Sequence, residues 1–383
     1  MAIEVGVRLR VIAFGLLVQV GACGLWYPPI DDHLRAAAFL LRFEGSEDVE
    51  GLAGYGLHDI DEREAGWERG RARYYEPMRD DAPALLLVHG IHPQGIDEPR
   101  FVQFARSLAS SGIRVMTPEL PTLTEFRVSD EAVPIIAAAA TAFAAEAHRE
   151  TVGVVGISFG GGLSLLAAAS PDGSNIGFVL SIGGHHDLRR VSRFFAGESV
   201  TDPDGHGPTV EPHVYGQGVL IYAHAERLFP EADLAEVRTV LSLMLHERFD
   251  AATQRLAASQ LSSTGRTRLQ AVVARRSTPG LRAEVLEALE DAEDELLRAS
   301  PAEKVAGLRI PVFLVHGADD PIVPAIETRW LASELPEQAL EEVLVTGVLS
   351  HAQYDRPPSL EERWAMVHFM ARVLATVEAQ PAL

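Results

Sequence analysis

The stretch that decides the fold is Val152-Gly153-Val154-Val155-Gly156-Ile157-Ser158-Phe159-Gly160, in which an apolar run leads into a serine set between two glycines. The run predicts a buried strand, and the small and apolar residues 161–169 predict a helix that begins at once. In such a corner the serine hydroxyl stands on a strained turn, and the flanking glycines avoid clashes that a β-carbon would make. Ser158 is therefore a candidate nucleophile, although an ordinary Gly-rich turn has the same pattern.

A second motif lies upstream, where the apolar strand 84–88 runs into His89-Gly90-Ile91. Acyl transfer needs backbone N–H donors aimed at the oxyanion, and a glycine in the turn lets the chain approach the nucleophile closely. We predict that the N–H groups of Ile91 and Phe159 form the oxyanion hole. His89 and Gly90 are expected to support this loop, His89 by hydrogen bonding and not by proton transfer.

A third motif supplies a carboxylate. The apolar strand 310–316 ends in Gly317-Ala318-Asp319-Asp320, before Ile322-Val323-Pro324. A general-base imidazole needs a carboxylate that fixes its tautomer and stabilises its protonated form. The spacing to the Ile-Val-Pro element favours Asp320 over Asp319, and the alternative is a pair of aspartates that only shape the turn.

The fourth motif supplies a histidine. The stretch 340–351 predicts a strand and a short loop that lead to His351, roughly 30 residues after the acid, which completes the order Ser, Asp, His. The chain has 14 histidines, and the position of His351 just past the last predicted core strand singles it out.

With these four motifs in order, the chain resembles the α/β-hydrolase superfamily from about Ala82 to the C-terminus. The resemblance implies an α/β fold with a mostly parallel central sheet, helices on both faces and a helical cap insertion. It also implies a triad of Ser158, Asp320 and His351 that requires no cofactor and no metal. Serine at the corner argues against the dehalogenases and epoxide hydrolases of this superfamily, which carry an aspartate there.

The rest of the chain divides around these motifs. Residues 23–81 predict a connecting helix near 33–43 and edge strands near 51–61 and 69–77. Residues 82–185 and 302–383 predict the two parts of the hydrolase core, because strands alternate there with helical patterns.

Residues 186–301 predict the helical cap, which the superfamily usually carries at this point. Pro and Gly cluster at 202–208, and helical patterns follow at 236–247 and 281–298. At its entrance, Gly183-Gly184-His185-His186-Asp187 has the look of a metal cluster. Zinc sites need three or four converging ligands, so we interpret the two histidines as hinge or solvated residues.

The N-terminus predicts a signal peptide or anchor over residues 1–22. Arg8 and Arg10 precede the apolar segment 11–22, which is too short for a span of about 20 residues. Cys23 follows and is the only cysteine, so no intramolecular disulfide can form. Val20-Gly21-Ala22-Cys23 resembles the lipobox of bacterial lipoproteins, which predicts lipidation of Cys23 and attachment to a membrane of the bacterial cell envelope. An uncleaved anchor, and a cytoplasmic protein with an apolar N-terminal helix, remain alternatives.

Composition limits the partners. The chain has 383 residues, of which 47% are hydrophobic, so it can bury a large core. Its formal net charge of -21 disfavours a nucleic-acid partner, because phosphate contacts need clustered Lys and Arg.

Taken together, the sequence predicts a serine hydrolase that cleaves a small-molecule carboxylic ester through an acyl-enzyme. The same residues would also suit an amide or thioester substrate, or acyl transfer to an acceptor other than water. The alternative from another class is a non-catalytic envelope lipoprotein that uses the fold as a binding module.

Overall fold

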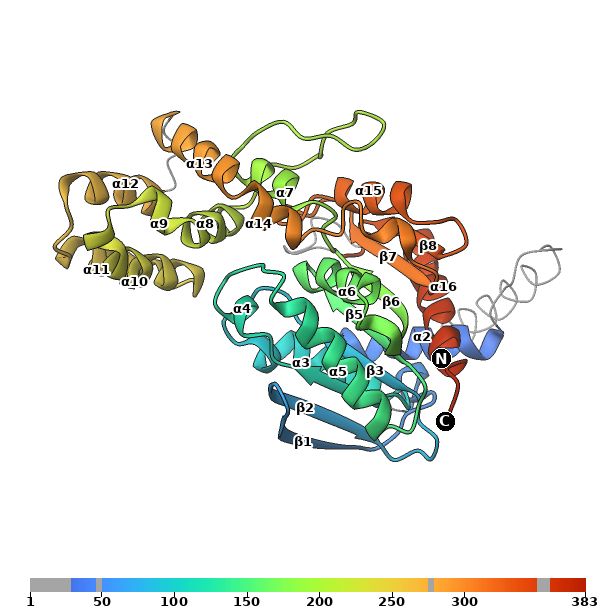
Figure 1. The fold of residues 1–383 in the computed structure, drawn as a ribbon. Helices are drawn as coiled ribbons and strands as arrows, with labels where there is room; N and C mark the ends of the chain where they lie inside the picture. Colours follow the sequence, from blue (N-terminus) through green and yellow to red (C-terminus); the bar gives the residue numbers. More distant parts are fainter. Residues whose placement is uncertain (1–28, 46–49, 275–278, 350–358) are drawn as a thin grey trace, which may run out of the picture.

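The structure is a computed structural model that describes residues 29–45, 50–274, 279–349 and 359–383. Cys23 and His351 lie outside the described residues. At the centre is an eight-stranded sheet with the strand order β1-β2-β4-β3-β5-β6-β7-β8 (Figure 1).

The strands from β4 to β8 across the sheet are parallel, whereas β2 runs antiparallel to both of its neighbours. Strands buried on both faces read as continuous apolar runs, which is why the central strands were recognisable in the sequence. The strands are β1 Ile60–Trp67, β2 Gly70–Pro77, β3 Ala84–Val88, β4 Arg114–Pro118, β5 Val152–Ile157, β6 Ile176–Ile182, β7 Val312–Gly317 and β8 Leu340–Thr346.

Helices cover both faces of the sheet. In β7, Val312 and Leu314 pack on one side and Phe313 and Val315 on the other, as the period of two along a strand requires. The first face is covered by α5 (Ala132–Glu146), α6 (Phe159–Ala169) and α15 (Ile326–Glu334), and the second by α2 (Ile30–Phe43), α3 (Pro99–Ala109) and α16 (Leu360–Glu378). The predicted α/β-hydrolase fold is confirmed.

The described residues between β6 and β7 form helices that lie beyond one end of the sheet (Figure 1). They share an apolar cluster that also takes in Phe159, Val323 and Ile326 of the core. The helix expected over 281–298 is in fact two helices that meet at Ala292. The helices are α7 Leu188–Phe195, α8 Val214–Ala223, α9 Ala225–Leu228, α10 Leu234–Leu245, α11 Phe249–Ala258, α12 Ser263–Val273, α13 Pro279–Asp291 and α14 Glu293–Arg298. Shorter helical turns are α4 Pro121–Thr124, η1 Leu52–Gly54, η2 Gly95–Asp97, η3 Gly173–Asn175, η4 Glu231–Asp233 and η5 Val305–Gly307.

The first predicted edge strand, 51–61, is wrong. Its residues form the turn η1, and β1 begins only at Ile60. Arg42 explains the difference, because its buried guanidinium donates to the carbonyls of Ala53 and Tyr55 and so holds this segment against α2. The second predicted strand, 69–77, is confirmed as β2, but it is not an edge strand, because it pairs with β1 on one side and β4 on the other and β1 forms the edge. Among the helices in the described ranges, none has the length and apolar character needed to cross a membrane.

Candidate active site

Ser158 forms the corner between β5 and α6. Its backbone has φ 54° and ψ -131°, a conformation that non-glycine residues adopt at a cost of order 1–3 kcal/mol. Its N–H donates to the Ile182 carbonyl at 2.7 Å, and its own carbonyl accepts from the Gly161 N–H at 2.8 Å. The end of β6 and the first turn of α6 therefore hold the strained corner in place.

The two flanking glycines are required for steric reasons. A β-carbon at position 160 would lie 2.5 Å from the His89 carbonyl oxygen, and one at position 156 would collide with the carbonyl of Gly160. No other residue type fits at these two positions unless the backbone moves, which is the clash that the sequence motif predicts.

The turn after β3 lies directly against the serine. A β-carbon at Gly90 would come 3.0 Å from the β-carbon of Ser158 and 3.7 Å from its Oγ. Phe159 is the first residue of α6, where N–H groups lack intrahelical partners and the helix dipole favours negative charge. The structure thus brings Gly90, Ser158 and Phe159 together, and the oxyanion role of the Ile91 and Phe159 N–H groups stays a prediction.

His89 fixes this turn. Its Nδ1 donates to the Gly90 carbonyl at 2.7 Å, and its Nε2 accepts from the Leu120 N–H at 3.0 Å. Because a carbonyl only accepts and an N–H only donates, the ring is the neutral Nδ1-H tautomer. Burial lowers the pKa of His89 to about 4, which fits a role in orienting the loop.

The two aspartates of the acid loop point in different directions. Asp320 is 2% exposed, and its Oδ1 accepts from the N–H groups of Ile322 and Val323 at 2.8 and 3.1 Å. Asp319 is exposed and accepts from the Thr209 hydroxyl at 2.9 Å. Only Asp320 is directed into the protein, so it is the better placed of the two, and its catalytic role stays a prediction.

His316 is a site residue that the sequence reasoning missed. It is fully buried at the end of β7, where its Nε2 donates to the Val323 carbonyl at 2.7 Å and lies 3.5 Å from Asp320 Oδ2. The Thr328 hydroxyl lies 2.7 Å from its Nδ1. The ring thus holds the loop around Asp320, and the only signal in the sequence is its place just before Gly317.

Ser158 and Asp320 follow the carboxyl ends of β5 and β7, on either side of β6. A β-carbon at Gly183, just past β6, would lie 3.6 Å from Asp320 Oδ2. Ligands of open α/β sheets bind outside these carboxyl ends, so the candidate site occupies the expected edge of the sheet.

Comparison with known proteins agrees with this geometry. A model of the alpha/beta hydrolase family matches residues 85–360. The chain belongs to the alpha/beta hydrolase family. No curated protein matches this hydrolase in sequence.

A solved structure of low sequence identity shows the same fold. A candidate hydrolase from Legionella pneumophila is 12% identical, with a TM-score of 0.58 over 91% of this chain and 96% of its own. An acylaminoacyl peptidase from Pyrococcus horikoshii is 16% identical, with a TM-score of 0.48 over 87% of this chain and 44% of its own. The hydrolase described here spans less than half the length of the acylaminoacyl peptidases that it matches.

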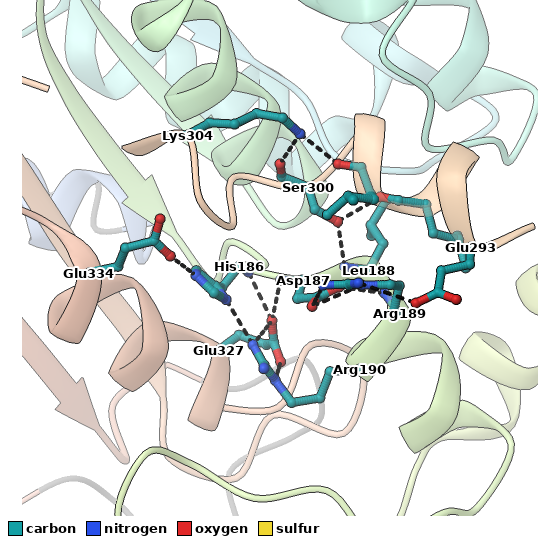
Figure 2. A network of polar contacts seen from close by, with 12 residues as sticks. His186, Asp187, Leu188, Arg189, Arg190, Glu293, Ser300, Lys304, Glu327 and Glu334 are labelled. Atoms are coloured by element: carbon teal, nitrogen blue, oxygen red, sulfur yellow. Dashed lines mark hydrogen bonds and ion pairs between the residues drawn. The ribbon is translucent and has the colours of Figure 1, made fainter. Parts of the chain in front are cut away.

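His186, the second of the two adjacent histidines after β6, belongs to a network of polar contacts that ties α7 to α15 (Figure 2). His186 lies between Glu334 and Arg190, at 2.5 and 2.9 Å. Buried Glu327 accepts from the backbone N–H groups of His186 and Asp187 and pairs with Arg190. Of the two alternatives for these histidines, hinge or solvated residues, the solvated one is wrong, because both rings are buried where the helical insertion leaves the sheet.

His185 is the other member of this pair. Its Nε2 donates to the Ala299 carbonyl at 2.9 Å, and burial lowers the pKa of His185 to about 4. The neutral ring therefore joins the two ends of the insertion.

Within the described ranges, one group of three side chains has the spacing of metal ligands: Asp202, Asp204 and His206. The Asp202 carboxylate already accepts from Arg329 and from the N–H groups of the other two residues. The loop thus satisfies this carboxylate without an ion, and we assign no metal to it.

The helical insertion of this hydrolase contains a cavity of about 90 Å³ with walls from α7, α8, α10, α11, α12 and α13. Neither Ser158 nor Asp320 lines it. Tyr215 does, and its hydroxyl donates to the Ile91 carbonyl at 3.5 Å. A lone tyrosine in a cap helix gave no sequence signal for this contact with the predicted oxyanion turn.

Proposed function

We propose that this hydrolase cleaves a carboxylic ester through an acyl-enzyme on Ser158. The observation that carries the proposal is the strained corner at Ser158 with Gly90 packed against it. Backbone strain of this kind persists where the surrounding structure imposes it, and it gathers at functional sites. The buried Asp320 at the same edge of the sheet adds support.

In the proposed reaction, Ser158 Oγ attacks the acyl carbon while His351 takes its proton. The oxyanion that forms accepts from the Ile91 and Phe159 N–H groups, and Asp320 orients His351 and stabilises its protonated form. Collapse breaks the bond to the alcohol oxygen, which receives the proton from His351. Water then attacks the acyl-enzyme by the same route and releases the carboxylic acid and Ser158.

A fluorophosphonate probe tests the proposal, because only an activated serine reacts with it. We expect labelling of the intact protein and hydrolysis of p-nitrophenyl butyrate, with losses of several orders of magnitude in Ser158→Ala and His351→Ala. Ser170→Ala, at the other end of α6, is the matched control and should behave as wild type. More than about a tenth of the activity in Ser158→Ala would place the chemistry elsewhere.

Two rival functions are separated by the same assay. Matched butyryl ester, amide and thioester substrates show which bond is cleaved, and added alcohols show whether the acyl group is transferred to an acceptor other than water. A protein that neither reacts with the probe nor turns over any of these substrates would favour the non-catalytic binding module.

For the N-terminus we propose lipidation of Cys23 and attachment to the cell envelope, on the lipobox-like residues 20–23. Expression in a bacterium with labelled palmitate should give a labelled protein in the membrane fraction that resists a high-salt wash, since two or three acyl chains anchor firmly. Cys23→Ser should lose the label. Unlabelled protein that begins at Met1 in the soluble fraction would contradict both the lipoprotein and the anchor readings.

A further inference from the structure

His316 and Thr328 are two polar residues that are buried together behind the acid loop. The His316 ring is 0% exposed at the end of β7, and Thr328 is 1% exposed in the first turn of α15. Burial of polar groups is costly unless they are hydrogen-bonded, and apolar side chains of similar shape at both positions would fill the space with little loss of stability. Packing alone therefore does not account for this pair.

Hydrogen bonds lead from this pair to the candidate acid. His316 Nε2 donates to the Val323 carbonyl at 2.7 Å, because a carbonyl only accepts. Among the described residues, the Thr328 hydroxyl has no hydrogen-bond partner other than His316 Nδ1, at 2.7 Å. The hydroxyl therefore donates its proton to that nitrogen, and the ring is the neutral Nε2-H tautomer. The Val323 N–H in turn donates to Asp320 Oδ1 at 3.1 Å.

The orientation of the Asp320 carboxylate depends on this chain of donors. His316 holds Val323 at its carbonyl, and Val323 directs its N–H at Oδ1. The other oxygen, Oδ2, lies 3.5 Å from His316 Nε2. Hydrogen bonds that follow one another in a buried chain polarise one another. Loss of the His316 donor would leave the Val323 carbonyl without its partner and would let the loop turn the carboxylate away.

The first turn of α15 gives the Thr328 hydroxyl a fixed position. Glu327, the residue before it, is 0% exposed and accepts from the backbone N–H groups of His186 and Asp187 (Figure 2). These two bonds tie the start of α15 to the segment that follows β6. Thr328 is therefore held in place next to the His316 ring.

We infer that His316 is a positioning residue for the candidate triad acid, and that Thr328 fixes the tautomer in which His316 acts. The inference rests on the proposed function and goes beyond it, because both residues act through Asp320 and not on the ester. In the proposed reaction, Asp320 stabilises protonated His351 only while its carboxylate is aligned with the imidazole. His316 and Thr328 keep that alignment.

Paired variants test the inference with p-nitrophenyl butyrate. His316→Leu should lower kcat by about 10- to 100-fold with little change in KM, as for a catalytic group displaced by about 1 Å. His316→Gln keeps an N–H donor close to the place of Nε2 and should recover most of the lost kcat. Thr328→Val should also lower kcat, and Thr328→Ser, which keeps the hydroxyl, should restore it.

A pH profile separates positioning from a purely structural role. The acid limb of the kcat/KM profile reports protonation of the catalytic base in the free enzyme. Because an aligned carboxylate favours the charged imidazole, His316→Leu should move this limb to lower pH by about one unit. Phe39→Leu, in the core between α2 and α3, should lose stability but keep the wild-type profile. An unshifted limb in His316→Leu, or no recovery in His316→Gln, would overturn the inference.

A measurement without turnover separates this inference from the proposed function. In the Ser158→Ala background, the NMR titration of the Asp320 carboxyl carbon should have a higher midpoint in His316→Leu, because the carboxylate loses aligned donors. His316→Gln should keep the midpoint of the parent protein. Equal midpoints in all three proteins would overturn this inference. The expected shift in a protein that cleaves no ester would overturn the ester hydrolase proposal alone.

Discussion

Gly90 and Ser158 pack so closely that a β-carbon at position 90 would lie 3.0 Å from the β-carbon of Ser158. A β-carbon this close would require a shift of a few tenths of an ångström at one of the two positions. Ser158 is held by backbone hydrogen bonds to both β6 and α6, whereas the turn is held by the His89 side chain, so we expect the turn to move. We therefore expect a substitution at Gly90 to displace the predicted oxyanion turn relative to Ser158.

Gly90→Ala should therefore lower kcat by about 10- to 100-fold, somewhat less than the complete loss of one oxyanion donor, while KM for p-nitrophenyl butyrate changes little. Gly66→Ala is the control, since a β-carbon there, on the exposed edge strand β1, meets nothing closer than 4.0 Å. Wild-type kcat in Gly90→Ala would show that the turn takes no part in the reaction.

The neighbouring aspartates give a second prediction. Asp320→Asn should reduce kcat by roughly 10⁴-fold, because the amide stabilises the wrong histidine tautomer. Asp319→Asn should stay within about threefold of wild type, as an exposed substitution in contact with Thr209. Each variant serves as the control for the other when kcat is measured with p-nitrophenyl butyrate. A larger loss of kcat in Asp319→Asn than in Asp320→Asn would mean that Asp319 is the acid.

The elements that could be predicted are those with a strong local pattern. β3 has the bounds expected from the apolar run 84–88. The corner at Ser158 was predictable because the space around positions 156 and 160 admits only glycine. Prediction from local sequence patterns was wrong where side chains distant in the sequence determine the backbone conformation. Arg42 hydrogen-bonds to the carbonyls of Ala53 and Tyr55, and this contact holds the segment in a turn where a strand was predicted. The break between α13 and α14 at Ala292 lies among residues that favour helix, so the local sequence does not indicate it.

In the candidate site, too, residues with a local sequence pattern could be predicted and residues that act through long-range contacts could not. Ser158, Gly90 and Asp320 follow strand ends, so their neighbourhood was predictable from the order of the motifs. His316 and Tyr215 act through contacts across the fold, at Val323 and Ile91, and a histidine or tyrosine at such a position has no pattern of its own.

Buried Glu327 gives a prediction on stability. It accepts from two backbone N–H groups and pairs with Arg190 (Figure 2). Glu327→Ala should lower the free energy of unfolding by about 3–5 kcal/mol, because it leaves the guanidinium and both N–H groups without their acceptor. Urea titration measures the loss, and Glu337→Ala on the same segment of chain, at an exposed site, should change it by less than about 0.5 kcal/mol. Equal effects would contradict the structural role of the network.

His185 gives a prediction on pH. Burial lowers its pKa to about 4, whereas an unfolded chain has a histidine pKa of about 6.5, so the unfolded state binds the proton more readily. The stability that neutral His185 contributes is complete above pH 6.5 and is lost as the pH falls toward 4, by about 2 kcal/mol at pH 5. His185→Gln should flatten this part of the urea-derived stability curve. His206→Gln, whose side chain is 72% exposed, should keep the wild-type slope, and identical curves for the two variants would contradict the assignment.

Tyr215 gives the last prediction, on the link between the insertion and the oxyanion turn. Tyr215→Phe keeps the ring in the cavity wall but removes the hydroxyl that donates to the Ile91 carbonyl. A hydrogen bond contributes about 0.5–1.5 kcal/mol, and the 3.5 Å distance places this one at the lower end, so kcat for p-nitrophenyl butyrate should fall by about two- to threefold. KM should hold, because the ring stays in place. Tyr222→Phe is the control, since this ring packs edge-on against Phe126 and should leave both constants as they are. A rise in KM of Tyr215→Phe with kcat intact would instead mean that the hydroxyl contacts the substrate and does not position the turn.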